Sequence, residues 1–356
     1  MRFFKGLSAK TVGVSAAVVT VLIWAAFIVI ARASADPSRG ATLTPFDIGL
    51  ARILGASAVL LPWGWWLVRN DRAQALACPA VTAAHAVPTV PRHSSLFGLS
   101  PLSLRVSATV GLFGGLLYAL LAYSGFVFAP AAHASVLLPG GLPLWTALLA
   151  LLVLGDRITV ARALGLAFII AGCLLVGGAS LLHAFDGGDV WKGDALLVLA
   201  SMCWSIYSVL ARRHALDAVR ATIAITAFAF FIYVPVYGLL LALHAVPSHF
   251  LTAPWRDVLF QMLFQGVGSV VIAGITFTKM IQYFGPVRCT MITALVPSLS
   301  ALTAVVFLGE PLSWNLWAGL ALVTLGILFG VRGVRGAKPN TIKIVANNVD
   351  STRARA

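Results

Sequence analysis

Charged side chains are scarce in this 356-residue chain, where Asp, Glu, Lys and Arg together make up 10% of the residues. A soluble protein carries about 25% charged residues, so the composition excludes a water-soluble domain. Hydrophobic residues make up 60% of the chain and recur in long runs along its whole length. Such runs are long enough to cross the ~30 Å hydrocarbon core of a bilayer as helices. The sequence therefore predicts an all-α integral membrane protein.

Cysteine and catalytic motifs are scarce as well. The four cysteines, Cys78, Cys173, Cys203 and Cys289, show neither disulfide nor zinc spacing, so we interpret them as packing residues and expect no metal site. The 11 acidic residues fall at the ends of apolar runs or in loops, and no hydrolase, metalloprotease or nucleotide-binding motif is present. We therefore expect no enzyme activity and no cofactor.

The net charge is +14, and the basic residues are distributed unevenly between the predicted loops. With the N-terminus inside, nineteen Lys and Arg residues lie on the cytoplasmic side and four lie outside. This asymmetry is the positive-inside signal, and it predicts cytoplasmic N- and C-termini in the inner cell membrane. We interpret the positive charge as a feature of topology and lipid contact, not of nucleic-acid binding.

The apolar runs predict ten transmembrane helices. The expected ranges are 12–31, 46–67, 106–127, 131–154, 160–182, 193–211, 221–243, 257–282, 287–308 and 314–332. A cytoplasmic loop is expected over 68–105, and a basic cytoplasmic tail over 333–356.

A repeated pattern divides these helices into two groups of five. Pro143 precedes Gly155 by twelve residues, and Pro297 precedes Gly309 by twelve. Gly165 and Gly172 follow the first glycine at the same spacings as Gly319 and Gly326 follow the second. Such coincidences indicate an internal duplication. Because each copy has an odd number of spans, the repeats 11–182 and 193–332 should have inverted orientations, as in many secondary transporters.

The prolines point to a binding site between the repeats. Pro143 and Pro297 lie in the middle of the fourth and ninth spans, where proline removes an amide donor and frees a carbonyl. Broken helices at matching places are typical of the midplane site of a carrier. A simple kink that shapes the bundle is the alternative interpretation.

Several polar and aromatic residues deep in the spans are candidate substrate contacts. Besides the two prolines these are Trp24, Tyr118, Tyr123, Trp204, Tyr207 and Gln265, although packing would also explain them. Arg52, inside the second span, offers a positive site for an anionic group of a substrate. It would otherwise reach the interface or pair with Asp47 or Asp194.

Two further residues are candidates for a charge or proton role. His133 lies near the start of the fourth span, where it either packs with a hydrogen bond or carries a proton. Lys279 lies near the inner end of the eighth span and either reaches the interface or takes part in coupling.

These motifs together resemble the EamA-type family of the drug/metabolite transporter superfamily. The resemblance covers roughly residues 11–332 and rests on the paired prolines, the turns at Gly155-Asp156 and Gly309-Glu310, and the G-L-A-x4-G pattern of spans five and ten. Arg52 also fits, whereas Asp156-Arg157 and the long 68–105 loop depart from the pattern. The resemblance implies a ten-span carrier of small organic solutes with a central cavity.

The leading functional hypothesis is a secondary-active transporter that exports small metabolites, such as amino acids, by alternating access. A solute channel or a lipid-linked flippase on the same scaffold is the alternative within transport. A membrane enzyme or an assembly scaffold is the alternative from another class. The expected partners are a small-molecule substrate and the lipid bilayer, with the chain as a monomer or a homodimer.

Overall fold

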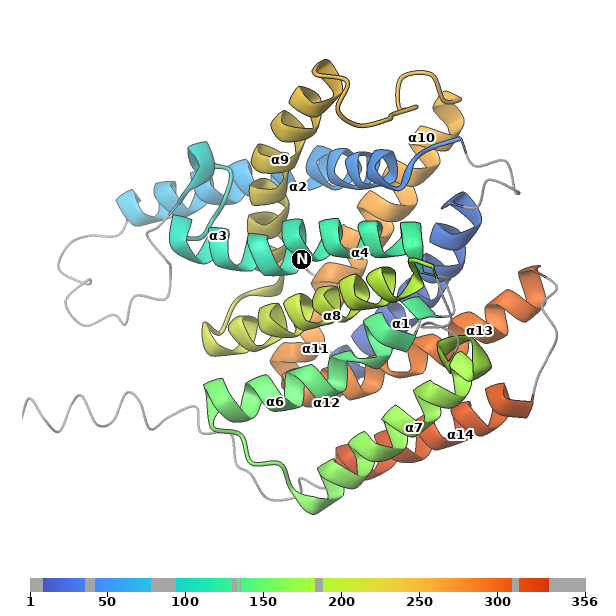
Figure 1. Cartoon of the computed structure of the whole chain (residues 1–356). Coiled ribbons are helices and arrows are strands. Elements are labelled where there is room, and N and C mark those ends of the chain that lie inside the picture. Colours follow the sequence, from blue (N-terminus) through green and yellow to red (C-terminus); the bar gives the residue numbers. More distant parts are fainter. Residues whose placement is uncertain are drawn as a thin grey trace, which may run out of the picture.

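A computed structural model gives the fold of the chain (Figure 1) and describes residues 9–35, 42–77, 94–129, 133–134, 136–182, 188–308 and 314–332. The described residues form helices and turns, without a β-strand. Within these described ranges, seven helical stretches are long and apolar enough to cross a membrane: Lys10–Ala31, Pro45–Gln74, Leu104–Phe128, Val136–Leu154, Val190–Arg213, Ala218–Ala242 and Trp255–Phe284. Val160–Leu175 and Trp317–Gly330 are shorter apolar helices. This architecture fits a multi-pass membrane protein.

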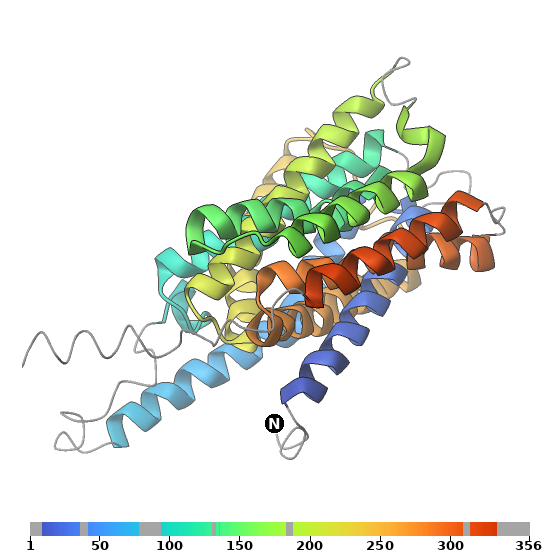
Figure 2. The same cartoon turned by 90° about the horizontal axis from the view of Figure 1, so that it is seen from below.

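The helices pack into one bundle, seen from two directions in Figures 1 and 2. The first half contains α1 (Ala9–Ala35), α2 (Pro45–Ala77), α3 (Leu104–Gly111), α4 (Leu117–Phe128), α6 (Leu142–Leu154) and α7 (Val160–Leu182). The second half contains α8 (Val190–Arg213), α9 (Ala218–Ala242), α10 (Trp255–Gln261), α11 (Ala273–Phe284), α12 (Pro286–Thr293), α13 (Leu295–Leu308) and α14 (Trp314–Arg332). The remaining segments are a 3₁₀ turn, η2 (Leu96–Gly98), and the π-helical η3 (Leu112–Leu116), η4 (Val136–Gly140) and η6 (Met262–Ile272).

The observed helix ends agree closely with several of the predicted ranges. α7 and α14 have the predicted bounds. α9 begins at Ala218, whereas the sequence predicts that this helix begins at residue 221. The predicted range 287–308 is occupied by α12 and α13 together. The number of membrane crossings, their inverted arrangement and the sides of the termini stay predictions.

The predicted loop 68–105 begins too early, whereas its predicted end lies within one residue of the start of α3 at Leu104. α2 continues through Ala77, and described structure resumes at Ser94, with η2 and a turn before α3. The sequence of residues 68–77, VRNDRAQALA, contains neither Pro nor Gly and is rich in helix-forming Ala, Arg, Gln and Leu. Because these residues continue the helix although they are polar, hydropathy alone places the end of α2 too early.

The predicted helix breaks occur in both corresponding spans. In the first, η4 ends at Gly140 and α6 begins at Leu142, with Pro143 in its first turn. In the second, α12 ends at Thr293 and α13 begins at Leu295.

The break before α6 is stabilised by α8. The Ser201 hydroxyl donates to the Leu138 carbonyl at 2.9 Å, and that of Ser205 donates to the Leu142 carbonyl at 3.4 Å. Both serines are fully buried. A protein neighbour therefore satisfies the carbonyl of Leu138, as an apolar environment requires.

Helices α7 and α14 lie side by side along one edge of the bundle (Figure 1). A Cβ atom added at Gly165 would lie 2.7 Å from the carbonyl oxygen of Gly326, and one at Gly172 would lie 2.7 Å from that of Gly319. These glycines allow close helix approach, because only hydrogen side chains fit between the two backbones.

Polar contacts fix α2 to α9 near both ends. At the start of α2, the buried Asp47 carboxylate accepts hydrogen bonds from the Tyr237 and Ser248 hydroxyls. Near its other end, Asp71 forms a two-pronged ion pair with Arg220, at 2.7 and 2.9 Å. Two-pronged Arg–carboxylate pairs fix orientation as well as distance, so α2 is held at a defined angle to α9.

Candidate functional site

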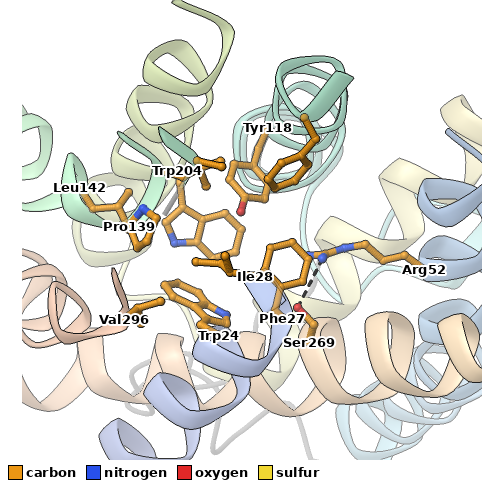
Figure 3. Close-up of a pocket in the computed structure, with 13 residues that line it drawn as sticks. Trp24, Phe27, Ile28, Arg52, Tyr118, Pro139, Leu142, Trp204, Ser269 and Val296 are labelled. Carbon is orange, nitrogen blue, oxygen red and sulfur yellow. Dashed lines mark hydrogen bonds between the residues drawn. The ribbon is translucent and has the colours of Figure 1, made fainter. Parts of the chain in front are cut away.

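A cavity in the middle of the bundle, here called the aromatic cavity, is walled by residues from both halves of the chain (Figure 3). Its walls are Trp24, Phe27, Ile28, Arg52, Tyr118, Phe126, Ala134, Leu138, Pro139, Leu142, Trp204, Ser269 and Val296. It contains about 510 Å³ of space not filled by protein atoms, part of it open to the surroundings. Small-molecule sites are concave and mostly apolar with a few polar groups, and the lining of this cavity has that composition.

Three aromatic rings from three helices form one side of the cavity. The ring of Trp204 lies 4.7 Å from that of Tyr118 and 5.6 Å from that of Trp24, measured between centroids. Phe277 supports both tryptophans from behind, at 5.0 and 5.5 Å. Figure 3 shows the Tyr118 hydroxyl directed between Trp204 and Phe27. These rings offer flat apolar faces to a solute, because aromatic groups stack at such distances.

Arg52 brings a positive charge to the opposite side. Its Nη1 donates to the Ser269 hydroxyl at 3.3 Å, and its guanidinium carbon lies 5.7 Å from the centre of the Phe27 ring. Figure 3 shows the arginine entering the cavity from α2, with its tip at Ser269 and Phe27.

The suggested pairing of Arg52 with Asp47 or Asp194 is wrong. The Asp47 carboxylate accepts hydrogen bonds from the Tyr237 and Ser248 hydroxyls, and the Asp194 carboxylate contacts Nδ1 of His133. Within the described parts of the chain, Arg52 forms no ion pair with a carboxylate. A neutral hydroxyl and an aromatic face neutralise a guanidinium only partly, so the site retains an excess of positive charge.

The two interrupted spans form the end wall of the cavity. A Cβ atom added at Gly140 would lie 3.6 Å from Cγ of Pro297, so the two breaks meet there. The cavity itself is lined by Pro139 and Val296, whereas Pro143 and Pro297 are not among the lining residues. The candidate prolines therefore shape the wall from behind.

A second cavity adjoins the first and is here called the small-residue cavity. Its walls are Arg52, Ile53, Ala56, Gly114, Gly115, Ala119, Trp204, Tyr207, Thr222, Ile225, Thr226, Ala229, Ser269, Val270 and Gly274. Arg52, Trp204 and Ser269 line both cavities. These three side chains, here called the partition, separate the two spaces.

The structure gathers five of the predicted contact residues at these cavities. Trp24, Arg52, Tyr118 and Trp204 line the aromatic cavity, and Tyr207 lines the small-residue cavity. The Tyr207 hydroxyl is bonded to that of Thr278 at 2.6 Å.

The other two candidate side chains line neither cavity. Tyr123 is 5% exposed and packs on Phe126 at 6.1 Å between ring centroids. Gln265 is fully buried in η6, and neither polar atom of its side chain has a hydrogen-bond partner in the part of the chain that the structure describes. The η6 segment packs backbone to backbone against α2. A Cβ atom added at Gly55 of α2 would lie 2.1 Å from the Met262 carbonyl oxygen of η6.

The two candidates for a charge role have different surroundings. His133 is buried, and its Nδ1 lies 2.9 and 3.0 Å from the two carboxylate oxygens of Asp194. Its neighbour Ala134 lines the aromatic cavity. Lys279 is half-buried on α11 and lines neither cavity.

Sequence reasoning missed most of the other lining residues, among them Phe27, Ser269 and Thr226. Phe27 follows Trp24 by three residues and Ser269 follows Gln265 by four, spacings that place each pair on one side of a helix. That spacing was the available signal for the first two. Thr226 has no comparable signal, because threonines are common in apolar helices.

No group of three or more His, Cys, Asp or Glu residues gathers as a metal site within the described ranges. The lining consists of aromatic rings, small residues, hydroxyls and one guanidinium. Such an arrangement can bind an amphipathic solute, and it offers no nucleophile paired with a base.

Comparisons with known proteins identify relatives along most of the chain. The sequence model of the EamA-like transporter family matches residues 11–178 and 191–332. The uncharacterized transporter YyaM of Bacillus subtilis (strain 168) is 25% identical over 241 residues, which are 67% of this chain and 76% of YyaM. A solved crystal structure superposes with a TM-score of 0.62 at 22% identity, covering 90% of this chain and 96% of the other. At that identity the superposition shows a shared fold alone.

Proposed function

Because the chain belongs to the EamA-like transporter family and is a multi-pass membrane transporter, we propose that its cargo is a small amphipathic anion bound in the aromatic cavity. The observation that carries this proposal is the position of Arg52. It brings a cation without a carboxylate partner among the described residues to the edge of a cavity lined by Trp24, Tyr118 and Trp204. A carboxylate at one end of a solute and an apolar or aromatic body at the other match this arrangement, so amino acids are the favoured class.

The proposed mechanism is alternating access of a secondary-active carrier with ten spans in two inverted repeats. In support, the aromatic cavity is lined by Trp24 and Tyr118 from the first half and by Trp204 and Ser269 from the second. A site shared by two halves opens to opposite sides when one half rocks against the other. The interrupted helices at Gly141 and Ala294 meet at this site and provide places where the spans bend.

The proposed direction is export across the inner cell membrane, with both termini in the cytoplasm. The support is the distribution of Lys and Arg over the loops, nineteen against four, together with the resemblance to exporters. The transport unit is proposed to be one chain, as a monomer or within a homodimer, because the aromatic cavity is built from one chain alone.

Counterflow in proteoliposomes tests the proposal. We expect vesicles loaded with unlabelled phenylalanine to accumulate external labelled phenylalanine transiently, because a carrier returns faster when it is loaded. Empty vesicles containing the same protein are the matched control. A channel would equilibrate the label without stimulation, and an enzyme or a scaffold would give no protein-dependent uptake. Either of these results, across a panel of amino acids, would reject the carrier assignment.

We further propose that the His133–Asp194 pair is the site at which protons couple to transport. An imidazole in contact with a carboxylate can take up and release a proton, and this pair adjoins the cavity wall at Ala134. Asp194 is the charged group that contacts the imidazole among the described residues. Lys279 provides a comparison, because it lies away from both cavities.

A pH-sensitive dye inside the vesicles measures this coupling. We expect phenylalanine flux through the unmodified protein to move protons in the opposite direction. His133→Gln is expected to reduce dye response per transported phenylalanine at least about fivefold, because its amide does not protonate near neutral pH. Lys279→Gln should leave the ratio unchanged. Equal proton movement per solute in His133→Gln and the unmodified protein would exclude this site.

A further inference from the structure

The small-residue cavity adjoins the aromatic cavity at the partition. Arg52, Trp204 and Ser269 line both spaces, so a solute group bound to the guanidinium is accessible from either side. A guanidinium carries five N–H donors in a planar fork, and its bond to Ser269 uses Nη1. Arg52 can therefore hold one carboxylate while the rest of a solute changes cavities.

Several wall residues of this second cavity are small. Gly114, Gly115, Ala119 and Gly274 line it, and about 590 Å³ inside it is not filled by protein atoms, again partly open. Tyr207 packs directly on Gly114 and Ile225 on Gly115, because added Cβ atoms there would lie 2.7 and 2.8 Å from these side chains. The unfilled space beside them takes a compact group of a solute.

Thr226 distinguishes this cavity from an ordinary packing defect. Its side chain is 3% exposed, and its hydroxyl has no hydrogen-bond partner within the described residues. Thr222, one turn earlier on α9, lines the same cavity and donates its hydroxyl to the Ala218 carbonyl at 2.8 Å. Buried hydroxyls are normally bonded, so the free donor of Thr226 is unusual.

The partition carries a second free donor. The indole Nε1 of Trp204 has no hydrogen-bond partner within the described residues, and the ring is 7% exposed. Trp204 and Thr226 both line the small-residue cavity, so two free donors and the Arg52 guanidinium border one space. Donors of this kind bind a hydrogen-bond acceptor, such as a carboxylate or carbonyl oxygen.

We propose that the small-residue cavity is a second substrate subsite, in which Thr226 binds the carboxylate end of the solute on its way past Arg52. This inference rests on the proposed transport function and adds a second stage to it. The N-terminal half of α9 is cytoplasmic in the proposed orientation, so this subsite receives the solute before the aromatic cavity does. Substrates therefore need an acceptor group at the end opposite their apolar body.

Two isosteric substitutions test the subsite. Thr226→Val removes the free hydroxyl, whereas Thr290→Val, at a buried position of α12 outside both cavities, removes a hydroxyl that already bonds to its own helix backbone. We expect Thr226→Val to raise the half-saturation concentration of cytoplasmic-side phenylalanine about 3- to 10-fold, the effect of losing one hydrogen bond. Thr290→Val should leave it within twofold, and Thr226→Ser, which keeps the hydroxyl, should restore the original value.

The outcomes separate this inference from the function on which it rests. If the unmodified protein shows no counterflow with any amino acid, the transport proposal itself fails. If it shows counterflow and Thr226→Val has an unchanged half-saturation concentration, the second subsite alone is rejected. An equal rise in Thr290→Val, or a failure of Thr226→Ser to restore affinity, would also reject it, because the effect would then come from packing. Thermal melting of each purified variant checks that all three fold.

Discussion

Replacing Arg52 by Gln is expected to raise the half-saturation concentration for phenylalanine about 10- to 100-fold, while phenylalaninamide changes less than threefold. A hydrogen bond to a charged group contributes about 1.5–3 kcal/mol, and 1.4 kcal/mol corresponds to a factor of ten. Arg52 lines both cavities, so its loss affects the solute at each proposed stage. Phenylalaninamide keeps the aromatic body and lacks the carboxylate, and it therefore reports on the charge alone.

Arg52→Lys is the matched control for this prediction. Lysine keeps the charge but loses the planar fork, so we expect an intermediate loss for phenylalanine. The competing explanation is that Arg52 supports the fold through Ser269 and Phe27. In that case Arg52→Gln would impair both substrates equally and lower the melting temperature. Equal impairment of the two substrates in a stably folded variant would show that Arg52 does not bind the carboxylate.

The general architecture could be predicted from composition, because bilayer thickness fixes the length of an apolar helix. α7 and α14 occupy the predicted ranges, and the glycines that join them were identified from spacing alone. The end of α2 could not be predicted from hydropathy, because residues 68–77 are polar and still helical. Pro62 and Pro235 do not end their helices, so a proline alone does not define a span boundary.

The candidate site was only partly predictable, for a physical reason. In a membrane helix, lipid-facing and buried positions are both apolar, so the sequence does not show which side faces a cavity. Trp24 and Trp204 were found because they are aromatic and deep in their helices, and they do lie in contact. Gln265 was found because it is polar and deep in its helix, yet it lines neither cavity, while Thr226, an ordinary residue by type, lines one.

The second large effect is expected at the contact between α7 and α14. Gly172→Ala should lower the melting temperature by several degrees, because its Cβ atom would lie 2.7 Å from the Gly319 carbonyl oxygen and 2.9 Å from the Val323 nitrogen. Overpacking of this kind costs about 1–3 kcal/mol. The backbone atoms of two helices cannot rotate away as a side chain can, so relief requires the helices to separate.

Gly238→Ala gives the opposite expectation and is the control. Gly238 lies on an exposed position of α9, and an added Cβ atom there meets nothing within 4 Å. Alanine favours a helix over glycine by about 1 kcal/mol, so this variant should be as stable as the unmodified protein or more stable. Thermal melting followed by size-exclusion chromatography measures both variants. If Gly172→Ala melts as high as Gly238→Ala, the two backbones are not in the close contact described, and α7 with α14 would not form a rigid support behind the cavity wall at Gly140, which adjoins Cys173 of α7.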